Sequence, residues 1–222
     1  MRRAAIAAGL LAAASALCCA TLVLRTERTG DSHYSFLLLN LALAWVPPAF
    51  AGVAYLARSR ASLVLPLSVG WLLFFPNAPY ILTDFIHLAD DPHSSLLWYD
   101  ALMVASFAWT GLVLGLASLY LMHLVARPVV GAWAWGGVLL TLLFGSLGVY
   151  LGRFVRINSW DALVRPRRVG HVLAHQLRDP THHPRMVGTL CLLTLFLAVA
   201  YGLVYVTAES SSRDLAGPQR SL

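Results

Sequence analysis

The stretch from Phe74 to Leu88 reads FFPNAPYILTDFIHL and decides how the chain is built. It interrupts an apolar run that starts at Leu63. By Phe75 that run has covered only about 20 Å of helix, at 1.5 Å per residue. The hydrocarbon core of a bilayer is roughly 30 Å thick, so the interruption falls at membrane depth.

Two prolines make this interruption a break in the backbone. Pro76 and Pro79 each remove a backbone donor and clash with a preceding carbonyl. Irregular backbone at membrane depth persists where it is buried in protein or lines a wet cavity. We therefore expect a broken third helix, whose second half begins at Asn77 as its N-cap and points its freed N–H groups into the bundle.

The composition places the whole chain in a membrane. Of its 222 residues, 59% are hydrophobic and 12% are charged, and the mean hydropathy is +0.70. A typical globular domain outside membranes is nearer half apolar and a quarter charged. The three cysteines lie in apolar stretches without metal-ligand spacing, so they are interpreted as small core residues.

Apolar stretches of membrane-spanning length recur along the chain. We predict an all-α membrane protein: a six-helix transmembrane bundle with a proline-broken third helix and an amphipathic surface helix between spans five and six. The spans are residues 4–24, 34–57, 63–83, 100–126, 129–152 and 186–208. Residues 1–208 form a single polytopic domain, and residues 209–222 are expected to be a short disordered polar tail.

The first span has two interpretations. Arg2 and Arg3 before an alanine-rich run are compatible with a signal peptide, but the apolar stretch is longer than a usual signal segment, which favours a membrane anchor.

The orientation in the membrane is nearly undetermined by charge. All sixteen basic residues are arginines. They divide almost evenly between the two faces, so the positive-inside rule gives only a slight preference for a cytoplasmic N-terminus.

A polar stripe is expected to follow the break. Asn77, Tyr80, Asp84, His87 and Asp91 are spaced by three or four residues, as on one face of an α-helix. Polar residues on a helix that starts inside the membrane face the bundle interior rather than lipid. The alternative is that the helix leaves the membrane near Asp84, where polar residues are unremarkable.

Further polar residues lie on the same membrane face, because the loops after spans three and five share a side by parity. The first of these connections carries Asp90, Asp91, His93, Trp98, Tyr99 and Asp100, and the second carries Arg153, Arg156, Asn158, Trp160 and Asp161. We expect the carboxylates of Asp84 and Asp100 to approach the guanidinium groups of Arg153 and Arg156. A purely structural role for such pairs is the alternative.

Two GxxxG patterns support close helix approach. They run from Gly111 to Gly115 and from Gly148 to Gly152, in spans four and five. Small residues at this spacing let two membrane helices approach closely. We expect spans four and five to pack through these glycines.

The segment between spans five and six has amphipathic character. In residues 165–178, valines and leucines recur at helical spacing while arginines and histidines fill the other positions. Such a helix lies on the membrane surface and attracts anionic lipid head groups. Since the positive charge sits at helix ends and on this segment, no nucleic-acid partner is expected.

Three ordered motifs, PNAPYILTDFIHL, WYD and GRFVRINSWD, resemble those of an uncharacterised family of bacterial membrane proteins. This family is number 1361 among the domains of unknown function, and the resemblance covers Leu63 to Tyr201. It implies a bacterial polytopic membrane protein, which places the chain in the cytoplasmic membrane. The family has no established activity, so the resemblance assigns no catalytic role and no cofactor.

The leading hypothesis for function is binding or transport of a polar or anionic ligand at the polar cluster. The candidate ligand-binding residues are Asn77, Tyr80, Asp84, His87, Asp100, Arg153, Arg156, Asn158, Trp160 and Asp161. Six spans make a small bundle, and a homo-oligomer is expected.

Two alternatives remain open from the sequence. The first is an enzyme acting on a lipid or lipid-linked substrate, with Asp84, His87 and Asp100 as catalytic candidates and Asp84 and His87 as weak metal ligands. The second is a structural or regulatory subunit whose polar face docks another membrane protein.

Overall fold

The structure is a computed structural model, and it describes residues 2–90, 96–157, 161–178 and 184–216. Every regular element in these ranges is helical. Five stretches are long and apolar enough to cross a membrane: Ala5–Thr29, Phe36–Leu56, Ala61–Ala89, Leu97–Val155 and Pro184–Ser210. The prediction of a multipass helical membrane protein is therefore confirmed.

Two membrane-spanning helical segments precede the break and the span that contains it. Helix α1 (Arg2–Thr29) is followed by α2 (Phe36–Ala44) and α3 (Val46–Leu56), which meet at Trp45. Pro47 and Pro48 stand in the first turn of α3, where a missing N–H is tolerated because it has no intrahelical partner. The proline pair thus starts a new helix within the second span.

The third span is broken where the prolines predict. Helix α4 (Ala61–Phe74) ends, a single turn α5 (Asn77–Tyr80) follows, and a 3₁₀ helix η1 (Ile81–Asp90) continues the chain. The expectation of a second α-helix is wrong, because α5 is one turn long and the remainder has three residues per turn. The expected N-cap is also wrong, since Pro76 occupies that position and makes no side-chain cap.

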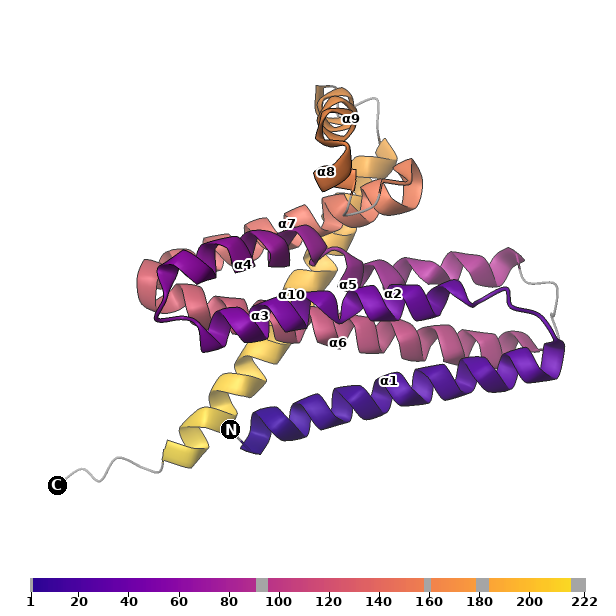
Figure 1. The fold of residues 1–222 in the computed structure, drawn as a ribbon, viewed down its shortest axis with the longest axis horizontal. Coiled ribbons are helices and arrows are strands. Elements are labelled where there is room, and N and C mark those ends of the chain that lie inside the picture. The colour runs from indigo at the N-terminus through magenta and orange to yellow at the C-terminus, as the bar shows by residue number, and fades with distance from the viewer. Residues whose placement is uncertain (1, 91–95, 158–160, 179–183, 217–222) are drawn as a thin grey trace.

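The second half of the chain reverses direction once more within one apolar stretch. Helix α6 (Leu97–Val130) leads through the short η3 (Gly131–Trp133) into α7 (Ala134–Tyr150) and the π-helical η4 (Leu151–Val155). Gly131 has a φ of 59°, which glycine adopts readily. Figure 1 shows α7 returning beside α6 after this turn.

The chain closes with a surface segment and a long helix. Helices α8 (Asp161–Val164) and α9 (Pro166–Arg178) precede α10 (Pro184–Ala216), which extends into the segment expected to form a disordered tail. Figure 1 shows α9 almost end-on while α1, α3 and α6 run across the view, so α9 lies across the bundle direction. The apolar side chains of Val169, Val172 and Leu173 pack against Tyr150, Leu151, Ile157 and Met186.

Burial identifies the centre of the bundle. In the most apolar window of Leu97–Val155, 67% of residues are buried, against 11% in the windows of α1 and α10. Helix α6 therefore forms the core, while α1 and α10 present exposed leucines and valines such as Leu10 and Leu195 on their outer sides. Exposed apolar side chains on these helices suit contact with lipid.

The glycines of the two GxxxG patterns pack against the broken segment, residues 76–80, rather than against each other. A Cβ on Gly111 would lie 2.8 Å from the Ala78 carbonyl oxygen, and one on Gly115 would lie 3.0 Å from Ala78 Cβ. A Cβ on Gly148 of α7 would lie 2.5 Å from Pro76 Cγ, and one on Gly152 of η4 would lie 3.0 Å from the Tyr80 ring. The expectation that the two GxxxG patterns pack together is wrong, because both receive the PNAPY segment.

Candidate functional site

The break is repaired by hydrogen bonds that the two prolines cannot make. Pro79 has no N–H to donate to the Phe75 carbonyl, and the Ala78 N–H donates to it instead at 3.2 Å. This leaves the Phe74 carbonyl, which accepts from Asn77 Nδ2 at 3.0 Å. Since an unpaired carbonyl inside a membrane costs several kcal/mol, Asn77 stabilises the end of α4 and not the start of the next helix.

The 3₁₀ geometry of η1 gathers polar side chains along one side. With three residues per turn, Ile81, Asp84 and His87 fall on the same face. Ile81 and Asp84 have no exposed surface, whereas Phe85 and Ile86 on the other side are exposed. The predicted stripe therefore persists through Asp84 and His87 with a different period. Its last member, Asp91, lies outside the described residues.

The side chain of Arg153, in the π-helical η4, points into this face and contacts several of its side chains. Its Nε donates to Thr83 Oγ1 at 2.8 Å, and its Nη1 donates to His87 Nε2 at 3.0 Å. Its Nη2 pairs with Asp84 Oδ1. The guanidinium carbon also lies 4.4 Å from the centre of the Tyr80 ring, a cation–π arrangement. The structure thus brings together Tyr80, Asp84, His87 and Arg153 as predicted.

The carboxylate of Asp84 is equally well engaged. Its Oδ1 receives Arg153, and its Oδ2 accepts from Asn40 Nδ2 at 2.9 Å. The Asp84 side chain is fully buried and that of Arg153 is 8% exposed. A buried pair of this kind is neutral overall, and removal of either partner strands a charge.

The hydrogen bond to Arg153 determines whether His87 Nε2 donates or accepts. A guanidinium has only donors, so His87 Nε2 is the acceptor in this hydrogen bond. The metal and acid–base hypotheses require Asp84 and His87 to offer lone pairs to another cation or a substrate, and both groups already face Arg153. Within the part of the chain that the structure describes, no cluster of three or more His, Cys, Asp or Glu side chains could hold a metal.

Asp100 does not join this cluster. It is fully buried at the start of α6, where its Oδ1 pairs with Arg25 Nε on α1 at 3.1 Å. Arg25 also reaches Asp31 Oδ2 at 3.4 Å and lies over the Tyr34 ring at 4.7 Å. The expected pairing of Asp100 with Arg153 or Arg156 is wrong, because α1 supplies a nearer cation. Parity would have found Arg25, since the loop after span one shares the same face.

Aromatic rings connect the two buried ion pairs. The His87 ring lies 4.7 Å from Phe36 and 6.5 Å from His33, centre to centre. His33 in turn contacts Tyr34 edge to face at 4.9 Å, next to Arg25. The two pairs therefore belong to one packed layer at this end of the bundle. The sequence reasoning missed Asn40, Thr83 and His33 in this layer.

Of the remaining predicted site residues, the structure describes Arg156 and Asp161. Arg156 is exposed, with the only positive φ among the described non-glycine residues, 58°. Asp161 begins α8 and is half-buried. Asn158 and Trp160 lie outside the described residues, as does His93. The structure does not bring Arg156 into any ion pair among the residues that it describes.

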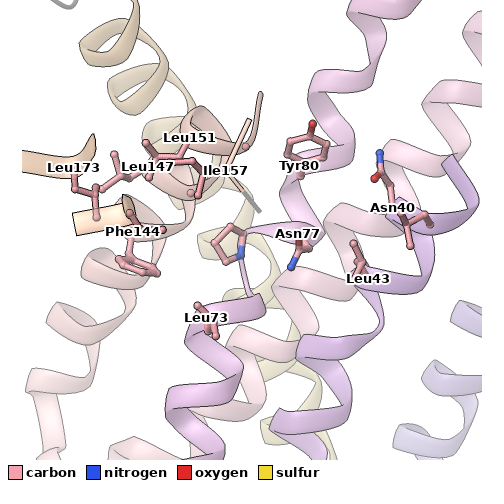
Figure 2. A pocket seen from close by; sticks show the side chains of 15 residues that line it. Asn40, Leu43, Leu73, Asn77, Tyr80, Phe144, Leu147, Leu151, Ile157 and Leu173 are labelled. Carbon is pink, nitrogen blue, oxygen red and sulfur yellow. The ribbon is translucent and has the colours of Figure 1, made fainter. Parts of the chain in front are cut away.

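A groove adjoins the cluster on the side of Tyr80, which lines it. Its volume is about 160 Å³, and Figure 2 shows its two walls. One wall carries Asn40, Leu43, Leu73, Asn77 and Tyr80, and the other carries Phe144, Leu147, Leu151, Ile157 and Leu173. Asn77 and Tyr80 both line this groove, but Asp84 and Arg153, which were expected to face the same cavity, are not among its lining residues, and most of the lining is apolar.

Comparison with known proteins identifies the family. A family model described as "Protein of unknown function (DUF1361)" matches residues 39–200, which is more than half of the chain. The match begins earlier than the resemblance in the motifs, within the second span, and includes every residue of the groove. No curated protein and no solved structure matches the chain. Because this match covers most of the chain, the protein belongs to the DUF1361 family of unknown function.

Proposed function

We propose that the chain is a membrane-embedded binding protein for an amphiphile, whose hydrocarbon chain occupies the groove between α2, α4, α7 and α9. The observation that carries the proposal is the shape and chemistry of this groove. Its walls are leucines, a phenylalanine and an isoleucine, and its polar groups, Asn40, Asn77 and Tyr80, come from one wall. Ligand sites in proteins are mostly apolar with a few placed polar groups.

The ion pair supports the groove as a rigid wall. Arg153 already makes contacts with four side chains of residues 80–87. Using it to bind an external anion would require breaking the pair and stranding Asp84. We therefore favour an amphiphile in the groove over a small anion bound by Arg153, which was the leading expectation from the sequence.

The same proposal includes a topology. We count α6 and α7 as separate crossings, because the chain reverses at Gly131, and this gives six spans in a cytoplasmic membrane. Helix α9 supports the groove from the membrane surface, since Val169 and Leu173 line it. Its arginines then face anionic head groups.

Saturable binding of a labelled amphiphile to the purified full-length protein tests the proposal. Tritiated 1-hexadecanol and tritiated palmitate would be titrated in parallel by scintillation proximity in detergent. Leu147→Trp places a larger side chain in the groove and should weaken binding by at least about tenfold, or 1.4 kcal/mol. The matched control is Leu139→Trp, on the exposed side of the same helix. If Leu147→Trp changes binding of neither probe relative to this control, the groove is not the site.

A further inference from the structure

We infer that the amphiphile has one hydrocarbon chain and an uncharged, hydrogen-bonding head group such as an alcohol. This inference rests on the proposed function and specifies its ligand class. It follows from the charge, the hydrogen-bonding groups and the size of the groove.

The lining of the groove carries no ionisable side chain that is charged at neutral pH. Among its fifteen residues the polar side chains are two amides and a phenol, those of Asn40, Asn77 and Tyr80. The Asp84–Arg153 pair lies behind this wall, on the far side of the Tyr80 ring, and its two charges neutralise each other. A carboxylate or phosphate in the groove would thus have no counter-ion among the side chains that line it, which is unfavourable.

The polar groups of the wall match a hydroxyl. Asn40 lines the groove and uses its amide nitrogen to donate to Asp84, which leaves its carbonyl oxygen as an acceptor. The Tyr80 hydroxyl can donate and accept, and its ring is fixed under Arg153. A hydroxyl head group can donate to an amide oxygen and accept from a phenol, so both polar groups would be satisfied by one ligand atom.

The size of the groove admits one chain. A cavity of about 150 Å³ is large enough to bind one benzene molecule, so 160 Å³ holds a segment of one hydrocarbon chain rather than two chains side by side, and the rest of a long chain would lie outside the groove. Leu39 and Phe144, at the rim, are 57% and 43% exposed. Because apolar rim residues on a membrane protein face hydrocarbon, the chain would enter from within the bilayer.

A competition series with constant chain length tests the head group. Bound tritiated 1-hexadecanol would be displaced from the full-length protein by unlabelled 1-hexadecanol, palmitate, hexadecyl phosphate and hexadecyltrimethylammonium. We expect the alcohol to compete at least about tenfold better than each charged analogue, because a charge there has no counter-ion. Tyr80→Phe should weaken binding of the alcohol several-fold while keeping the ring under Arg153.

The possible results separate this inference from the proposed function. If palmitate or the phosphate binds as well as the alcohol and Leu147→Trp abolishes that binding, the groove holds an amphiphile but the uncharged head group is wrong. If no probe shows binding that depends on Leu147, both the inference and the proposed function fail. Equal binding of 1-hexadecanol by the Tyr80→Phe protein would overturn the hydroxyl contact.

Discussion

The guanidinium of Arg153 and the carboxylate of Asp84 form a buried ion pair that joins the π-helical η4, which follows α7, to the 3₁₀ helix η1 behind the groove. They are 69 residues apart in the sequence. Thr83, His87, Tyr80 and Asn40 complete the shell around the pair, so neither charge is left without a partner. This relationship fixes one wall of the groove.

Arg153→Ala should destabilise the protein by about 3–5 kcal/mol, because it strands a buried carboxylate. The matched control, Arg60→Ala, removes an exposed arginine and should cost less than about 0.5 kcal/mol. Thermal unfolding in detergent, followed by intrinsic fluorescence, measures both. The double variant Arg153→Met with Asp84→Leu should recover much of the loss. Equal midpoints for Arg153→Ala and Arg60→Ala would show that the pair adds nothing to stability.

The second buried pair predicts a similar contrast within one helix. Arg25→Leu strands Asp100 and should cost about 3–5 kcal/mol, whereas Arg28→Leu, on the exposed side of α1, should be close to neutral. The same unfolding assay serves, with Arg25→Leu combined with Asp100→Leu as the rescue. A rescue that is no more stable than Arg25→Leu alone would contradict the assigned pairing.

Close packing of α7 on the broken segment predicts opposite effects for two glycines. Gly148→Ala places a Cβ 2.5 Å from Pro76 Cγ, and overpacking of this kind costs about 1–3 kcal/mol. Gly136→Ala has no atom within 4 Å of its new Cβ and should stabilise the helix by up to about 1 kcal/mol. The thermal midpoints should therefore move in opposite directions. A thermal midpoint of Gly148→Ala at or above that of the unaltered protein would mean that α7 does not pack closely on Pro76 as described.

The side chain of Asn77 is expected to matter through the backbone. Asn77→Leu removes the donor to the Phe74 carbonyl, and an unsatisfied buried acceptor costs about 1–3 kcal/mol. Ser68→Ala removes a hydroxyl that donates to a carbonyl in the same helix, that of Val64. It should be nearly neutral, because Val64 is an ordinary helical acceptor. If both substitutions have the same effect on unfolding, the repair of the break by Asn77 is not supported.

The break and the Asp84–Arg153 cluster could be predicted from the sequence because their causes are local or topological. Pro76 and Pro79 lack donors wherever they stand, and parity brings the ends of spans three and five to one face. The partner of Asp100 and the role of the glycines could not be predicted in the same way. They depend on which helices are lateral neighbours, and spacing along one helix does not determine that order.

The groove could not be predicted from the sequence either. Its walls come from six helical elements, α2, α4, α5, α7, η4 and α9, and leucines that face a cavity have the same spacing as leucines that face lipid. The 3₁₀ winding of η1 was missed because residues 81–87 satisfy both a period of three and a period of 3.6. Charge patterns pointed to Arg153 as a binding group, whereas in the structure its guanidinium pairs with Asp84.

Site-directed photolabelling tests the central claim most directly, namely that the groove holds a single-chain amphiphile. The full-length protein would be irradiated with a diazirine-bearing hexadecanol and the modified residues mapped by mass spectrometry. We expect labelling of groove residues on α2, α4 and α7, such as Leu43, Leu73 and Leu147, that excess 1-hexadecanol and Leu147→Trp both suppress. Labelling spread evenly over exposed residues of α1 and α10, unaffected by competitor, would contradict the account.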